Sequence, residues 1–239
     1  PEAWSIRWYK NMIGDCSADV VSSTVPCSTK WMVGTVNSFY IGIIATVIAT
    51  ALGTLAALGL SRPHMPYKGL IMAILISPMI VPLIITAAGM FFFYARINLV
   101  YTFTGVILAH VALATPFVVI TVTATLVGFD MNMVKAAQSL GAKPMRTFFK
   151  VIMPLILPGI ISGALFAFIT SFDEVVIVMF MASIDQLTIP KQMWAGIRQE
   201  ISPVILCMAT CLVLLSIFLL TTVELLRRRS EKLRGIKAR

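Results

Sequence analysis

The sequence predicts an all-α polytopic membrane protein, and three observations support that fold class. Of its 239 residues, 59% are hydrophobic and only 12% are charged, whereas roughly a quarter of a soluble domain is charged. The mean hydropathy is +0.93, which means more apolar surface than a soluble fold of this size can bury. Five long stretches contain no Asp, Glu, Lys or Arg: residues 31–61, 69–95, 97–129, 151–172 and 201–223. These features argue against a soluble enzyme, a disordered protein and a nucleic-acid-binding module, despite the net charge of +9.

Each charge-free stretch is long enough to cross a bilayer as a helix. About 20 apolar residues, rising ~1.5 Å each, span ~30 Å of hydrocarbon, and the shortest stretch has 22 residues. The stretches are continuously apolar and do not alternate, which excludes a transmembrane β-barrel and leaves helices. The sequence therefore predicts five transmembrane helices in a domain of residues 31–226, at about 36–61, 69–95, 102–127, 151–182 and 203–225.

Two of these spans carry local signals. The first has small residues at four-residue intervals, which let another helix approach closely: Ala45, Ala49, Gly53 and Ala57. The second contains Pro78 and Pro82, and each proline removes a backbone donor and predicts a kink or an opening. A broken membrane helix can line a substrate path, and a packing kink is an equally good interpretation of the two prolines.

The distribution of Lys and Arg predicts the orientation in the membrane. One side of the five spans holds 13 basic residues, including those of the tail at 227–239, and the other side holds 6. Because basic residues concentrate in the cytoplasm, the loop at 130–150 and the tail should be cytoplasmic, and residues 1–30 should be extracytoplasmic. Residues 1–30 contain no apolar core long enough for a signal peptide. An extracytoplasmic start without a signal peptide therefore predicts a sixth span upstream of residue 1.

The cysteines and histidines predict no metal site. Cys16 and Cys27 lie in the extracytoplasmic segment, where an oxidising compartment would permit a disulfide between them. Cys207 and Cys211 lie four residues apart in the last span and are expected to be small packing residues. The isolated His64 and His110 do not match the ligand spacing of a metal site.

Two adjacent acids, Asp173 and Glu174, interrupt the fourth span. A carboxylate at the bilayer centre costs at least ~2.5 kcal/mol, so such residues usually mark a substrate or ion path. They could equally lie at the outer interface, since the span already covers about 28 Å before Asp173. The loop beyond contains Met193, Trp194 and Ile197 at helical spacing, which favours a short interfacial helix over 189–198.

The loop at 130–150 predicts two helices joined by a turn. Helix-forming residues run up to Gly141, whose freedom at positive φ suits a helix C-terminus. Pro144 can begin the next helix at its first position. Glycine and proline would together fix the shape of this loop.

The same loop resembles the EAA loop of binding-protein-dependent ABC importer permeases: EAA, three residues, G, nine residues, then I-x-L-P. Here the pattern reads Lys135-Ala136-Ala137, Gly141, then Val151, Met153 and Pro154 at the same spacing. Lys135 stands where the family has glutamate. Further stretches resemble the spermidine/putrescine branch: Arg7-Trp8-Tyr9, Asn37-Ser38, residues 171–177 and residues 188–190.

The resemblance implies a six-span permease in the bacterial inner membrane whose coupling helix docks on a cytoplasmic ATPase. The implied coupling residues are Lys135, Ala136, Ala137, Gly141, Pro144 and Pro154. The implied partners are a second permease subunit, two ATPases and an extracytoplasmic solute-binding protein. The sequence contains no G-x-x-x-x-G-K-[ST] phosphate loop, so ATP and Mg²⁺ are expected in the ATPase subunits and no cofactor in this chain.

The predicted function is therefore transport without enzymatic activity, and half of a path for a small solute. Asp173 and Glu174 would suit a cation such as a polyamine, and Pro78 and Pro82 are the other candidate path residues. The main alternative is an ion-coupled transporter or channel that uses the two acids. A membrane-embedded enzyme is a weaker alternative, because no nucleophile and base are paired in the spans. Substrate identity, and whether the two permeases are alike, stay open from sequence.

Overall fold

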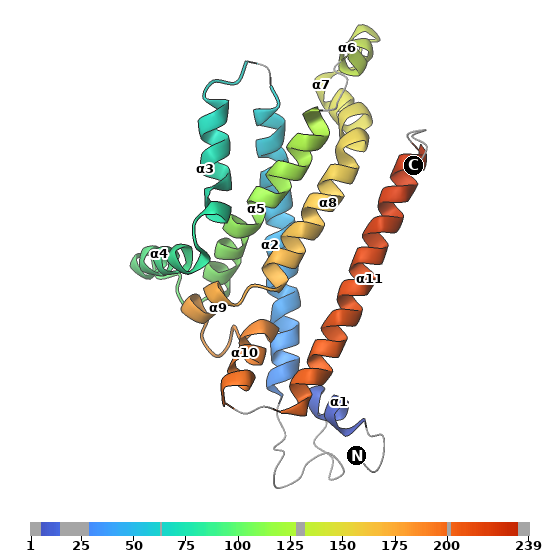
Figure 1. Cartoon of the computed structure of the whole chain (residues 1–239). Coiled ribbons are helices and arrows are strands. Elements are labelled where there is room, and N and C mark those ends of the chain that lie inside the picture. Colours follow the sequence, from blue (N-terminus) through green and yellow to red (C-terminus); the bar gives the residue numbers. More distant parts are fainter. Residues whose placement is uncertain (1–5, 15–28, 63, 128–131, 200–201, 234–239) are drawn as a thin grey trace. The chain divides into compact units, whose positions relative to one another are not determined.

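The computed structural model describes residues 6–14, 29–62, 64–127, 132–199 and 202–233. In these ranges it contains helices and no strand, which confirms the all-α prediction (Figure 1). In chain order the elements are α1 (Arg7–Met12), α2 (Lys30–Leu60), α3 (Lys68–Ile80), α4 (Leu83–Arg96), α5 (Phe103–Val127), α6 (Asn132–Ser139), α7 (Pro144–Thr147), the π-helix η1 (Phe148–Ile152), α8 (Met153–Phe172), α9 (Val176–Met181), α10 (Ile189–Gln199) and α11 (Pro203–Leu233).

The described residues contain four apolar spans, or the predicted five if one broken pair of helices is counted as a span. Four continuous segments are long and apolar enough to cross a membrane: Lys30–Leu60, Phe103–Val127, Pro144–Phe172 and Pro203–Thr222. The fifth is a broken pair, α3 and α4, which qualifies when the two helices are counted together. The second predicted span, 69–95, is therefore interrupted.

The interruption lies at the second of its two prolines. Val81 is extended, with ψ 136°, because a residue before proline is pushed out of the helical region. Pro78 stays inside α3. Its missing N–H would leave the carbonyl of Ile74 without a donor, and the Ser77 Oγ donates to that oxygen at 2.8 Å. The predicted opening thus occurs at Pro82, while a side-chain hydrogen bond keeps the helix intact at Pro78.

One predicted boundary is wrong. The fourth span was expected to run over 151–182, but α8 ends at Phe172, residues 173–175 are not helical and α9 is separate. The cause is Glu174, whose carboxylate accepts a backbone N–H beyond it, at the start of α9. The first part of the predicted tail, 227–239, is helical, since α11 continues beyond the apolar segment Pro203–Thr222 to Leu233. Arg, Lys and Glu are good helix formers, and no Gly or Pro follows Pro203 until Gly235.

The chain divides into two compact units. The first comprises Pro1–Ile44, Leu83–His110 and Phe172–Thr222, and the second comprises Ala45–Pro82, Val111–Ser171 and Val223–Arg239. In the second unit, Ala45, Ala49 and Ala57 are fully buried. A Cβ on Gly53 would lie 2.6 Å from the Cβ of Val118 on α5. The predicted stripe of small residues is therefore a site of close helix packing.

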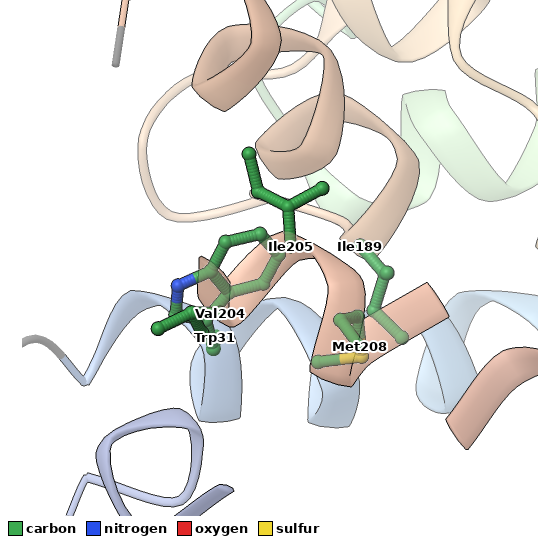
Figure 2. Packing of buried hydrophobic residues seen from close by; sticks show 5 residues of the cluster. All are labelled: Trp31, Ile189, Val204, Ile205 and Met208. Atoms are coloured by element: carbon green, nitrogen blue, oxygen red, sulfur yellow. The ribbon is translucent and has the colours of Figure 1, made fainter. Parts of the chain in front are cut away.

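In the first unit, a hydrophobic cluster joins the start of α2 to α10 and α11 (Figure 2). Its buried members are Trp31, Ile189, Val204, Ile205 and Met208. Trp8, Met12, Phe172, Met193 and Leu212 pack against it. The predicted helix over 189–198 is confirmed as α10, and its Met193 faces this cluster while Trp194 and Ile197 are exposed.

Candidate coupling loop and substrate-path residues

The end of α6 is a tight turn centred on Gly141, as the sequence predicts. Gly141 has φ +77°. Its N–H donates to the carbonyl of Gln138 at 2.9 Å, and the N–H of Ala142 donates to the carbonyl of Ala137 at 3.0 Å. These two bonds, one over three residues and one over five, form a Schellman motif, which requires a residue in the left-handed region. A β-branched residue at 141 would be strained there.

The turn leads directly into the membrane-spanning segment. Lys143 is extended and Pro144 occupies the first turn of α7, where its missing N–H would have no intrahelical partner. From Pro144 the chain runs through α7 and η1 into α8 without a break. Pro154 cannot donate to the carbonyl four residues earlier, which explains the widened π turn just before it. The turn is therefore joined to α8 by a continuous helical run.

The helix α6 projects from the second unit and rests on α7 and η1 (Figure 1). None of its residues is buried; Val134 and Ala137 are half-buried and the others are exposed. Leu140, just after the helix, is 89% exposed. The loop thus offers polar, small and apolar side chains on a rigid support.

The two acids after α8 have different environments. Asp173 is exposed, whereas Glu174 is only 7% exposed. The backbone N–H of Ile177 donates to the Glu174 Oε1 at 2.7 Å, so this carboxylate caps the N-terminus of α9. The two acids, adjacent in sequence, therefore differ in the structure, since Glu174 has a backbone partner.

The opposite end of α9 is held by Lys191 of α10. The Lys191 Nζ donates to the carbonyl of Ala182 at 2.8 Å and to that of Val178 at 3.4 Å. Burial lowers the pKa of this ammonium, while the two carbonyls satisfy its donors. An acid at the N-terminus and a base at the C-terminus of α9 both interact favourably with the helix dipole. This arrangement fixes the segment that follows α8.

Two polar residues of α2 anchor the loop between α9 and α10. The Asn37 Nδ2 donates to the carbonyls of Asp185 at 2.7 Å and Leu187 at 2.9 Å. The Ser38 Oγ accepts the N–H of Ile189 at 2.9 Å. From sequence, Asn37 and Ser38 show a family resemblance but no role. Their signal was that two adjacent polar residues lie within an apolar span.

The remaining predicted residues divide between the units. Pro78 and Pro82 belong to the second unit, and Asp173 and Glu174 to the first. The described residues contain no group of three or more His, Cys, Asp or Glu that could hold a metal. Cys16 and Cys27 lie outside the described residues, so their disulfide stays a prediction.

Known proteins resemble nearly all of this chain. The family model "Binding-protein-dependent transport system inner membrane component" matches residues 29–232. The spermidine/putrescine transport system permease protein PotC of Haemophilus influenzae is 30% identical over 82% of this chain and 76% of its own length. The putrescine transport system permease protein PotI of Escherichia coli K12 is 29% identical over 87% and 72%, respectively.

A solved structure supports the fold. The MetNI methionine ABC transporter, in an inward-facing conformation, contains a chain that matches with a TM-score of 0.60 and 19% identity. The match covers 91% of this chain and all of that one. Nothing in these comparisons favours an ion-coupled transporter or channel. On the family match and the relatives together, this chain belongs to the binding-protein-dependent transport system inner membrane components.

Proposed function

We propose that the chain is the transmembrane permease subunit of an ATP-driven importer and couples to a separate ATPase through residues 130–150. The observation that carries the proposal is the geometry of this loop. A helix without buried residues ends in a fixed turn at Gly141 and continues, from Pro144, into a membrane span. The absence of a phosphate loop from the sequence agrees with ATP and Mg²⁺ binding in the partner.

The mechanism is alternating access driven by contact with the ATPase. Moving a two-state equilibrium from mostly inward-open to mostly outward-open requires about 5.5 kcal/mol of differential binding. A flexible loop would offset part of that binding energy, because ordering it costs conformational entropy. The Schellman turn and Pro144 reduce the loop's freedom, and the unbroken run through η1 carries displacement into α8.

The partners follow from the position of the loop relative to α8. This helix has 20 residues, or about 30 Å at 1.5 Å per residue, so its two ends lie on opposite membrane faces. The ATPases bind on the side of α6, which is cytoplasmic together with the C-terminus. A solute-binding protein delivers substrate on the side of α9 and α10. A second permease subunit completes the path.

The substrate class that fits best is a polyamine or a related amine. The relatives named above are spermidine/putrescine and putrescine permeases. In this chain the exposed carboxylate of Asp173 is available to a cation, whereas Glu174 is engaged at α9. Asp173 is thus the stronger of the two candidates for a substrate contact, by charge complementarity.

The first experiment is affinity purification of the full-length protein from its native host in mild detergent. A P-loop ATPase and a second permease should co-purify. If the chain purifies alone and still transports solute after reconstitution, the proposal is wrong.

A Gly141→Val variant tests the loop itself. Valine at φ +77° strains the turn by roughly 1–3 kcal/mol, so several-fold less ATPase should co-purify. Gly89→Val is the matched control, since a side chain there meets nothing within 4 Å. Equal ATPase recovery with both variants would show that the turn has no part in docking.

A further inference from the structure

The described part of the loop beyond α5, residues 132–150, carries charges of one sign; Asp130 of this loop lies outside the described residues. Between residues 132 and 150 they are Lys135, Lys143, Arg146 and Lys150, with no acidic residue among them. All four are exposed. Where a partner covers this surface, the basic groups favour an anionic one, either lipid or a protein carboxylate.

Lys135 differs from the other three by its element. Arg146 lies on α7 and Lys150 on η1, both continuous with the span, where basic residues meet lipid headgroups. Lys135 lies on α6, before the turn. At 3.6 residues per turn, it is about 160° around the helix from Ala137, one of the two residues that face α7 and η1. It therefore points away from the rest of the second unit.

The residues beside Lys135 leave its ammonium uncovered. Ala136 and Ser139 beside it are small, and the Ser139 Oγ donates to the carbonyl of Lys135 itself at 3.0 Å. That hydroxyl proton is used internally, so the ammonium is the strongest donor on this face. Leu140, 89% exposed, lies at the end of the same helix.

Resting on the proposed function, we propose that the ATPase groove that receives α6 carries an Asp or Glu carboxylate that pairs with Lys135. Leu140 lies about 140° around the helix from Lys135, so it would meet a separate apolar surface of the same groove. In this pairing the loop supplies the positive charge and the ATPase the negative one, whereas the glutamate of the EAA pattern would supply a negative charge from the loop. The chain would consequently select an ATPase with an acidic groove and discriminate against one built for an acidic loop, since like charges across an interface repel.

The test measures the affinity of the purified full chain for the ATPase subunit that co-purifies with it, in detergent without added lipid. Lys135→Glu should weaken binding by roughly tenfold, and Lys135→Met by a smaller factor of about two to five. Lys68→Glu is the matched control, because Lys68 is exposed and is predicted to lie on the same membrane face; its affinity should change less than about twofold. Raising NaCl from about 0.05 to about 0.5 M should weaken the native complex more than the Lys135→Met complex.

A Leu140→Asp variant separates the inference from the proposed function. Leu140→Asp could abolish binding while Lys135→Glu binds as tightly as the native chain, or more tightly. In that case the loop docks on the ATPase, but the proposed carboxylate partner of Lys135 is wrong. If neither variant changes binding and both elute as the native protein does on size exclusion, docking through α6 is itself wrong. Restoration of Lys135→Glu binding by a carboxylate-to-lysine change in the ATPase would identify the paired residue.

Discussion

Replacing Gly163 by alanine should force α8 away from α5 within the second unit. A Cβ at this position would lie 2.5 Å from the Thr121 Oγ1 and 3.0 Å from the Cα of Val118. Rotation of Thr121 could relieve the first contact, but it would break the bonds from that hydroxyl to the carbonyls of Phe117 and Val118, at 2.9 and 3.1 Å. The Val118 Cα belongs to the backbone and cannot rotate away, so the helices themselves must separate.

The expected cost of the Gly163→Ala change is about 2 kcal/mol, within the range for overpacked cores. In a chain of this length that should lower Tm by roughly 4–8 °C, measured by size exclusion of heated, detergent-purified protein. Gly89→Ala is the control, because a Cβ there meets nothing within 4 Å, and its Tm should not fall. Adding Thr121→Ala to Gly163→Ala should recover part of the loss, since the contact with Val118 remains. Equal Tm values for Gly163→Ala and Gly89→Ala would refute the tight α5–α8 contact.

Two other regions give independent predictions. Asn37→Ala removes both bonds to the loop at 183–188 and should lower stability by about 1–3 kcal/mol. Amide exchange of that loop should then rise, whereas Thr35→Ala, whose hydroxyl bonds only within α2, should leave it unchanged. Glu174→Ala removes the cap of α9, so it should lower the free energy of unfolding by about 1 kcal/mol and lower Tm accordingly. Asp173→Asn should instead reduce uptake of a radiolabelled polyamine at unchanged Tm. Uptake lost equally in both variants at equal stability would contradict the separate roles of the two acids.

The features predicted correctly from sequence depend on short-range chemistry. The number of spans follows from the spacing of charges along the chain. The turn of the coupling loop follows from Gly141 and Pro144, because a left-handed φ and a missing N–H are properties of single residues. The opening at Pro82 likewise results from the steric effect of a proline on the residue before it.

The features that were missed depend on partners distant in sequence. Asn37 donates to carbonyls 148 and 150 residues away. No local sequence pattern predicts which carbonyls a polar residue of a span will bind. The end of α8 at Phe172 was missed because apolar residues resume at Val175. Termination there requires the Glu174 carboxylate to take a backbone donor and Lys191 to hold the far end of α9.

The glycines of α8 connect the packing to the proposed coupling. A Cβ on Gly159 would collide with the Thr125 side chain, and one on Gly163 with Thr121, so α5 and α8 touch along more than one turn. The coupling loop is attached to both helices, since α5 ends at Val127 just before it and α8 continues from it. Close-packed helices resist sliding past one another. On the proposed coupling, an ATPase that displaces α6 would move α5 and α8 together, and Gly163→Ala should lower transport per ATP hydrolysed in addition to Tm.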